Sequence, residues 1–450
     1  MTDLGTRTEP ALRRAAPALL GYAAVRVLGL LTLALWSAAR DKSAYTLLTA
    51  RWDALWYTRV AELGYGYEVR LPNGDVHSNL AFFPLLPWLE RLLHATTPLS
   101  YADAGFVVAL LASVAAAWGV FAVTDHIYGR RAGVCAVLVW AVLPVGVVQS
   151  MAYSESLFTA LAAWSLYAVL TGRWVTAGLL ASLAGLTRPV GLAVVAAVWV
   201  AGIAAFLRDR RDRAPSGSAT AAGEGTASTV RDPSAPHAGP HAGPFVRNRS
   251  AAGQRGAQAG GHAPAPDLTR GRGTEAGSSH IPGTHPVRRA LGMALAPVGT
   301  AAYVLWVGHR TGKGPFGYLD VQAGWRNGFD GGYAFARFVA DKFTSFPSAL
   351  AGVGLIVGVG LVVWLYVVCV RQGQPLPLLV YAGVVTALAL CASSYFGSKP
   401  RLLMPAFPLL LPLALALARS GTRRSAVTVA LIATASALYG AFWLNGSGPP

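Results

Sequence analysis

The sequence is poor in charged residues. Asp, Glu, Lys and Arg make up only 13% of its 450 residues, whereas 54% are hydrophobic. Soluble domains carry about 25% charged residues, so this deficit excludes an ordinary soluble protein. Apolar runs of about 20 residues recur along the chain instead, as expected of a polytopic membrane protein.

Acidic residues are the scarcer of the charged residues. The chain has 20 Asp and Glu against 37 Lys and Arg, for a net charge of +17. A basic excess can indicate nucleic-acid binding. Here most of it is Arg at the ends of apolar runs and in one polar segment, which is the cytoplasmic bias of membrane proteins. We therefore expect membrane lipids and no nucleic acid as partners.

Cysteine is also scarce. Cys135, Cys369 and Cys391 are far apart and lie in apolar runs, so they form neither a metal-ligand spacing nor a disulfide framework. We expect no cofactor and no metal, although Asp53 with Glu155 could bind a divalent cation. Walker A, GxGxxG, HExxH and GxSxG motifs are missing too. A cytoplasmic nucleotide-sugar domain is therefore excluded, and any sugar donor must be linked to a lipid.

The apolar runs predict an all-α polytopic membrane protein with about eleven transmembrane helices. The first run, 15–39, is too long for the h-region of a signal peptide and is expected to be the first span. It contains Arg26, which either reaches the headgroups or forms an internal ion pair. The further predicted spans are 102–124, 131–150, 152–170, 174–187, 189–207, 288–308, 346–370, 376–395, 401–419 and 424–444.

Composition divides the chain into three regions: membrane regions 1–207 and 288–450, and an insert, 208–287, between them. The insert is rich in Gly, Ala, Pro, Ser, His and Arg and almost lacks large aliphatic residues. It cannot bury enough apolar surface to offset its ordering entropy. We expect a disordered cytoplasmic insert, in which His237 and His241 belong to the tract rather than to a metal site.

Basic residues predict the orientation. With the N-terminus in the cytoplasm, the inner turns contain the Arg residues at 130–131, 173, 208–213, 371 and 419–424. Residues 80–93 then do not span, because a span there would invert every later helix. We expect a multi-pass protein of the plasma membrane. Five polar segments share its outer face: loop 40–100, turn 153–156, turn 186–189, loop 309–345 and turn 393–401.

The first outer loop, 40–100, is expected to contain interfacial helices. In a helix over 52–63, one apolar face suits the headgroup zone; it consists of Trp52, Leu55, Trp56, Val60 and Leu63, with Asp53 and Tyr57 on one flank and Arg51 and Glu62 on the other. Asp53 then has two interpretations. It is either a base that takes a proton from an attacking sugar hydroxyl or an acid stabilised by a helix N-terminus.

Further polar residues stand in apolar surroundings on the outer side. Glu155 is either a helix-start residue or a functional acid at membrane depth. Arg188, Lys399 and Arg401 run against the positive-inside bias, so we interpret them as ligands of a lipid phosphate; the alternative is anchoring to headgroups. Aromatic and polar residues in loop 309–345 suit either a sugar surface or a packed loop. Gly354 and Gly358 form a small-xxx-small pair that predicts helix packing.

Several motif blocks occur in an order that resembles the GPI mannosyltransferase II (PIG-V-like) family. The first reads Arg51-Trp52-Asp53-Ala54 with Tyr57. The others are Ala61-Glu62-Leu63-Gly64-Tyr65, Ala81-Phe82-Phe83-Pro84-Leu85-Leu86-Pro87, Tyr153-Ser154-Glu155-Ser156-Leu157-Phe158, Leu186-Thr187-Arg188-Pro189-Val190-Gly191 and Lys399-Pro400-Arg401 with Met404-Pro405-Ala406-Phe407-Pro408. The resemblance covers most of the chain outside 208–287.

The resemblance implies a GT-C-type glycosyltransferase that uses a polyprenyl- or dolichyl-phosphate sugar and inverts the anomeric centre. An acid of the first outer loop would act at the reaction centre, and Asp53 matches it. The candidate substrate-binding residues are Arg51, Trp52, Tyr57, Glu62, Glu155, Arg188, Lys399 and Arg401. A composition rich in Ala, Gly and Arg indicates a bacterial protein, so we expect mannose transfer to a glycolipid, glycan or protein rather than to a GPI precursor.

Two other functions compete with this hypothesis. A transporter or flippase of lipids or lipid-linked sugars should show inverted repeats and charges at the membrane midplane. Here the unusual charges fall on one face, which favours chemistry at the surface. The other competitor is a non-catalytic scaffold for a partner enzyme.

Overall fold

The computed structural model of the chain describes residues 10–213, 286–393 and 395–446. Contacts divide the chain into one unit of Met1–Arg208 with Ser279–Pro450 and another of Asp209–Ser278. The described helices and strands belong to the first unit, apart from the end of α9 (Leu192–Arg213). Residues 214–285 of the predicted insert, with His237 and His241, lie outside the described residues.

Within the described residues, six helical stretches are long and apolar enough to cross a membrane, and a bent pair makes a seventh candidate. The six are α1 (Ala11–Ala38), α5 (Tyr101–Tyr128), α9, α10 with α11 (Pro286–Leu295 and Val298–Thr311), α14 (Phe346–Arg371) and α18 (Thr422–Leu444). Three apolar helices are shorter: α7 (Ser154–Leu170), α8 (Trp174–Gly185) and α15 (Leu376–Cys391). The helical membrane fold is confirmed, but the count of about eleven spans is not.

Prolines break two of the predicted spans. In 131–150, α6 (Arg130–Ala141) ends shortly before Pro144, and the chain continues as η2 (Gly146–Ser150). In 401–419, the helical stretches on either side of Pro405 are bent by 77°; they contain η6 (Phe396–Ser398), α16 (Lys399–Leu403), η7 (Phe407–Leu410) and α17 (Leu411–Arg419). Proline lacks the backbone N–H and clashes with the preceding turn, so apolar composition alone overestimates the length of these helices.

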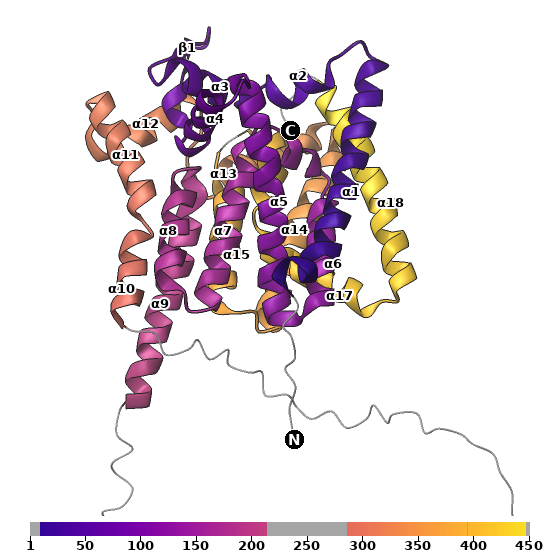
Figure 1. Cartoon of the computed structure of the whole chain (residues 1–450). Coiled ribbons are helices and arrows are strands. Elements are labelled where there is room, and N and C mark those ends of the chain that lie inside the picture. The colour runs from indigo at the N-terminus through magenta and orange to yellow at the C-terminus, as the bar shows by residue number, and fades with distance from the viewer. Residues whose placement is uncertain (1–9, 214–285, 394, 447–450) are drawn as a thin grey trace, which may run out of the picture. The chain divides into compact units, whose positions relative to one another are not determined.

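Loop 40–100 folds into short helices and a hairpin at one end of the helices, uppermost in Figure 1. Its helices are α2 (Ala44–Thr49), α3 (Asp53–Leu63), η1 (Asn79–Ala81) and α4 (Leu85–Thr96). The antiparallel hairpin of β1 (Glu68–Arg70) and β2 (Val76–Ser78) pairs Val69 with His77, and Asn73-Gly74 in its turn is the usual hairpin signal. Residues 80–93 contain no helix long enough to span, as predicted.

Turn 186–189 and loop 309–345, also predicted to be outer segments, contain or adjoin short helices. They are η3 (Pro189–Gly191), η4 (Gly314–Phe316), α12 (Gly317–Gly324), α13 (Tyr333–Asp341) and η5 (Lys342–Thr344). In Figure 1, α12 lies at the same end as α3 and β1. Of loop 309–345, α12 therefore lies at the end of the helices that loop 40–100 occupies.

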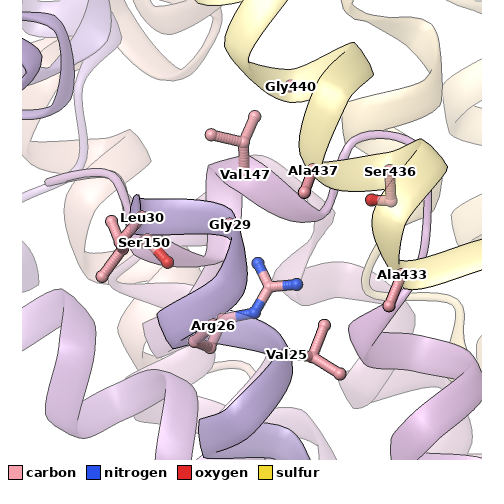
Figure 2. Close-up of a pocket in the computed structure, with 10 residues that line it drawn as sticks. All are labelled: Val25, Arg26, Gly29, Leu30, Val147, Ser150, Ala433, Ser436, Ala437 and Gly440. Carbon is pink, nitrogen blue, oxygen red and sulfur yellow. The ribbon is translucent and has the colours of Figure 1, made fainter. Parts of the chain in front are cut away.

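Arg26 of α1 is buried, with 9% of its surface exposed. It donates to the backbone carbonyl oxygens of Gly146 and Ala141, and Figure 2 shows its guanidinium directed toward the space between α1 and α18. Arg26 therefore follows neither prediction: it does not extend to the surface, and its described contacts are with carbonyl groups, not with an acid. Arg26 instead donates to backbone carbonyl groups on both sides of the break between α6 and η2.

Glycines allow close packing at a different place from the predicted pair. A Cβ added at Gly178 of α8 would overlap the carbonyl group of Gly292 in α10, and one at Gly299 of α11 would overlap that of Ser182. By contrast, no atom of the described structure lies within 4 Å of a Cβ added at Gly354 or Gly358. The expected packing at this pair is therefore not formed within the described chain, and the close crossing is that of α8 with α10 and α11.

Candidate active site

Four charged side chains from separate segments meet at the end of the bundle formed by loop 40–100. Arg401 Nη2 lies 2.9 Å from Asp53 Oδ2, and Arg401 Nε lies 3.2 Å from Glu155 Oε1. Arg188 forms an ion pair with the same Glu155 oxygen. Two carboxylates and two guanidinium groups thus form one chain of ion pairs, which we call the charge network. Its four formal charges cancel.

Local backbone structure places each of these residues. Asp53 begins α3, and Glu155 lies in the first turn of α7, where the free N–H groups of a helix favour a carboxylate. Arg188 is an extended residue directly before η3, and Arg401 lies in the short helix α16. Helix starts and breaks in four distant segments therefore produce the network.

The four side chains of the charge network differ widely in their exposure to solvent. Of each side chain, 27% is exposed for Asp53, 14% for Arg188, 9% for Arg401 and 1% for Glu155. Buried ions require partners that offset their lost hydration. Arg401 Nη1 is nevertheless buried with no hydrogen-bond partner among the described residues. The network therefore combines a carboxylate that solvent can reach with a guanidinium that has an unused donor.

Two tyrosines support the network. The Arg401 Cζ atom lies 5.0 Å from the ring centroid of Tyr153, a favourable position for a cation–π contact. The Tyr57 hydroxyl lies 2.7 Å from Ser154 Oγ, within hydrogen-bond distance. Burial raises the pKa of Tyr57, so its phenol stays protonated at neutral pH. Tyr57 was a substrate-binding candidate, and the structure places it as a buried link between α3 and the start of α7.

The other candidates of the first motif lie outside the network. Arg51 Nη1 donates to the backbone oxygen of Leu444 at the end of α18, 3.2 Å away, and the guanidinium lies 4.1 Å from the centroid of the Trp52 ring. Glu62 is exposed in the last turn of α3, distant along the helix from Asp53. Arg51 and Trp52 thus adjoin Asp53 only as the two residues before it in the chain, and Glu62 is not brought to it.

Lys399 also lies apart from the charge network. Only 4% of its surface is exposed. Its Nζ donates to the backbone oxygens of Ala389 and Ala392, each 2.8 Å away, at the end of α15. These bonds stabilise the C-terminal end of that helix, so the ammonium group is engaged away from Arg401.

The apolar face predicted for α3 is divided: Trp56 packs against other aromatic rings, whereas Leu55 and Leu63 are exposed. Trp56 stacks on Phe82 with ring centroids 5.6 Å apart and meets the edge of Trp325 at 4.9 Å. Trp325 also stacks on His77 at 4.1 Å, and its Nε1 donates to the Ser78 oxygen at 2.9 Å. Loop 309–345 is therefore a packed loop that docks on loop 40–100. Sequence analysis did not select His77, because nothing in the residues around it indicates that Trp325 packs on its ring.

The carboxylates considered for a divalent cation are both engaged by Arg401. Arg401 lies between Asp53 and Glu155 and pairs with an oxygen of each. Among the described residues, no group of three or more His, Cys, Asp or Glu side chains could hold a metal ion. The arrangement is that of an ion-pair network, and metal independence stays a prediction.

Comparison with known proteins finds a family model that matches part of the chain. The family model described as Mannosyltransferase (PIG-V) matches residues 35–212, a range that contains Asp53, Glu155 and Arg188. No curated protein matches the chain. Solved structures that match include ArnT from Cupriavidus metallidurans bound to undecaprenyl phosphate and in the apo state, each with 13% identity and with TM-scores of 0.47 and 0.44.

These alignments cover 93% and 94% of this chain, which spans only 63% and 62% of the two ArnT chains. The identity is low in both alignments. The family match rests on sequence and includes the motif blocks of the first outer loop and of turns 153–156 and 186–189. The predicted resemblance to the PIG-V mannosyltransferase family is therefore confirmed over residues 35–212.

Proposed function

We propose that this chain is an inverting membrane glycosyltransferase that moves mannose from a polyprenyl-phosphate donor to an acceptor hydroxyl. The observation that carries the proposal is the charge network. It joins a solvent-reachable carboxylate, Asp53, to the guanidinium groups of Arg401 and Arg188 through Glu155. The family match over residues 35–212 supports glycosyl transfer and mannose as the sugar.

The proposed reaction is a single displacement. The acceptor hydroxyl attacks the anomeric carbon as the bond between that carbon and the phosphate oxygen breaks. Asp53 takes the hydroxyl proton as a general base, and the bonding electrons leave with the polyprenyl phosphate. Attack opposite the leaving phosphate inverts the anomeric centre.

The arginines are suited to the leaving group. A guanidinium binds phosphate oxygens through a planar fork of N–H donors, and fixed positive charge favours a step in which negative charge develops. Glu155, with 1% of its side chain exposed, pairs with both Arg188 and Arg401. Its role in this proposal is to hold the two guanidinium groups together beneath the reaction centre.

We further propose that the site lies on the extracytoplasmic side of the plasma membrane, with the N-terminus in the cytoplasm. The positive-inside pattern of the inner turns supports this orientation. A lipid-linked donor would then reach the site from the bilayer, and the acceptor would be a glycolipid, a glycan or a protein. Lys399 keeps its predicted phosphate role only if it leaves the carbonyl groups that it now binds.

Transfer from a defined donor tests the proposal. Purified protein in nanodiscs is given mannosyl-phospho-undecaprenol with labelled mannose, and membranes of a strain lacking the gene supply the acceptor. Undecaprenyl phosphate is the ligand named for one ArnT structure, which makes it a suitable first carrier. We expect Asp53→Asn to reduce transfer by about a thousandfold.

The control is Glu68→Gln, which removes one exposed acid from β1 and should leave the rate unchanged. Near-normal transfer by folded Asp53→Asn would refute the role of Asp53 as base. If the unmodified protein moves labelled lipid from one leaflet of a vesicle membrane to the other and transfers no sugar, the result would instead support a transporter.

A further inference from the structure

Asp53 and an incoming phosphate require the same guanidinium. Without a donor, Arg401 Nη2 is paired with Asp53 at 2.9 Å. This ion pair keeps a carboxylate oxygen of Asp53 on the guanidinium and away from an acceptor hydroxyl. The residue proposed as base is thus restrained in the unloaded protein by the residue proposed to bind the leaving group.

The three nitrogens of the Arg401 guanidinium are used unequally. On the buried side, Nε contacts Glu155, and on the more exposed side Nη2 contacts Asp53. Neither Nε nor the third nitrogen, Nη1, has a hydrogen-bond partner among the described residues. A phosphate that engages the planar fork bidentately needs two adjacent donors, and on the Nη1 and Nη2 side Asp53 already occupies Nη2.

The two carboxylates differ in how firmly they are held. Glu155 is almost completely buried and pairs with both arginines, whereas Asp53 is 27% exposed and pairs with Arg401. The network is neutral before binding, so a phosphodiester brings a third anion to two guanidinium groups. Asp53 has fewer partners than Glu155 and is already in contact with solvent, so it is the carboxylate that the phosphate would displace.

We propose that Arg401 holds Asp53 in an inactive ion pair and releases it when the donor phosphate takes its place. This inference rests on the proposed glycosyl transfer and adds the order of events. Asp53 becomes a free base only in a loaded site, beside the acceptor hydroxyl. An unloaded site has no free base at this position.

Binding of the lipid product tests the competition. The probe is a polyprenyl monophosphate in detergent, with the uncharged polyprenol of the same length as a control for the chain. We expect Asp53→Asn to bind the phosphate about fivefold more tightly than the unmodified protein, because no ion pair has to break. Glu68→Gln removes the same charge at a distance and should not change the affinity.

A double-mutant cycle separates competition from simple repulsion between two anions. In an Arg401→Gln background, Asp53 has no guanidinium to surrender, so Asp53→Asn should no longer tighten binding. If Arg401→Gln does not fold, Arg401→Lys is the second background, because a point charge lacks the bidentate fork and the gain should fall to less than twofold.

Three results would overturn the inference. One is unchanged or weaker binding by Asp53→Asn. Another is equally improved binding in the Arg401 variants, which would indicate repulsion through space. The third is phosphate-independent binding, with phosphate and polyprenol bound equally by every variant; this result would also refute the donor assignment, whereas the first two leave glycosyl transfer intact.

Discussion

Glu155 and Arg188 form an ion pair between the start of α7 and the turn after α8. Only 1% of the Glu155 side chain and 14% of that of Arg188 are exposed. Because Arg401 contacts the same carboxylate, Glu155 compensates two buried positive charges at once. This relationship makes Glu155 the residue on which the network most depends for stability.

Glu155→Gln should lower the free energy of unfolding by about 3 kcal/mol, because it leaves two guanidinium groups buried without their shared anion. Thermal unfolding of purified protein in one detergent measures the effect. Asp125→Asn is the matched control, since Asp125 pairs with Arg14 where 45% of the arginine side chain is exposed, and it should cost less than about 1 kcal/mol. Equal losses in the two variants would contradict this account.

At position 52, a glycine substitution should be more stable than an alanine substitution. The Trp52 φ of 51° lies in a region that residues with a Cβ rarely adopt, directly before Asp53. Both Trp52→Gly and Trp52→Ala lose the ring, but only glycine relieves the backbone, so the glycine variant should be more stable by about 1 kcal/mol. Chemical denaturation of the two proteins provides the comparison.

Leu55, inside α3, is the control position. There the order should be reversed, and Leu55→Ala should be more stable than Leu55→Gly by about 1 kcal/mol. The same order at both positions would mean that Trp52 is not strained. The Trp52 substitutions should also reduce transfer, because the backbone that carries Asp53 would lose the contact of Trp52 with Arg51.

Gly178→Ala should destabilise the protein by about 1–3 kcal/mol, because the added methyl group overlaps the Gly292 backbone at the crossing of α8 and α10. Gly354→Ala is the control in another apolar helix, where the added Cβ meets no described atom within 4 Å. Retained melting temperature in Gly178→Ala, compared with Gly354→Ala in the same nanodiscs, would show that the crossing is looser than described.

Glu90 should make stability depend on pH. Its surface is 0% exposed, neither carboxyl oxygen has a hydrogen-bond partner among the described residues, and burial raises its pKa well above the ordinary range. The folded protein therefore holds the proton of the Glu90 carboxyl group more tightly than the unfolded chain, in which Glu has a pKa of about 4.3. The free energy of unfolding should fall as pH rises above that value and level off above the folded pKa.

Glu90→Gln should remove this part of the pH dependence, because the amide does not titrate. Melting temperatures of both proteins, measured between pH 4 and pH 8, give the difference. We expect the variant to gain relative to the unmodified protein as pH rises, and a constant difference over the range would refute the assignment.

Several features of the fold follow from local sequence. The apolar runs 15–39 and 346–370 nearly coincide with α1 and α14, because a helix in lipid must be apolar over its whole length. The runs 131–150 and 401–419 are apolar too, yet they break at prolines into shorter pieces. Counting apolar residues overestimates such spans, since hydropathy does not record a missing backbone N–H.

Lys399 and Arg401 show where local reasoning ends. Both are basic residues in one turn between apolar runs, and sequence analysis gave both the same predicted role. In α16 they are two residues apart, and residues at that spacing do not face the same side of a helix. Lys399 binds carbonyl groups of α15, whereas Arg401 joins Asp53 and Glu155.

The sequence by itself determined the membrane class, the polar segments that carry the motifs, and Asp53, Glu155, Arg188 and Arg401 as residues out of place in their surroundings. Such anomalies are local, because an acid or an arginine in an apolar run is visible without its partners. Only the tertiary structure decided which charges pair, that Lys399 and Glu62 stay outside the network, and that Asp53 is restrained by Arg401. Ion pairs depend on distance in space, and four segments far apart in the chain set those distances.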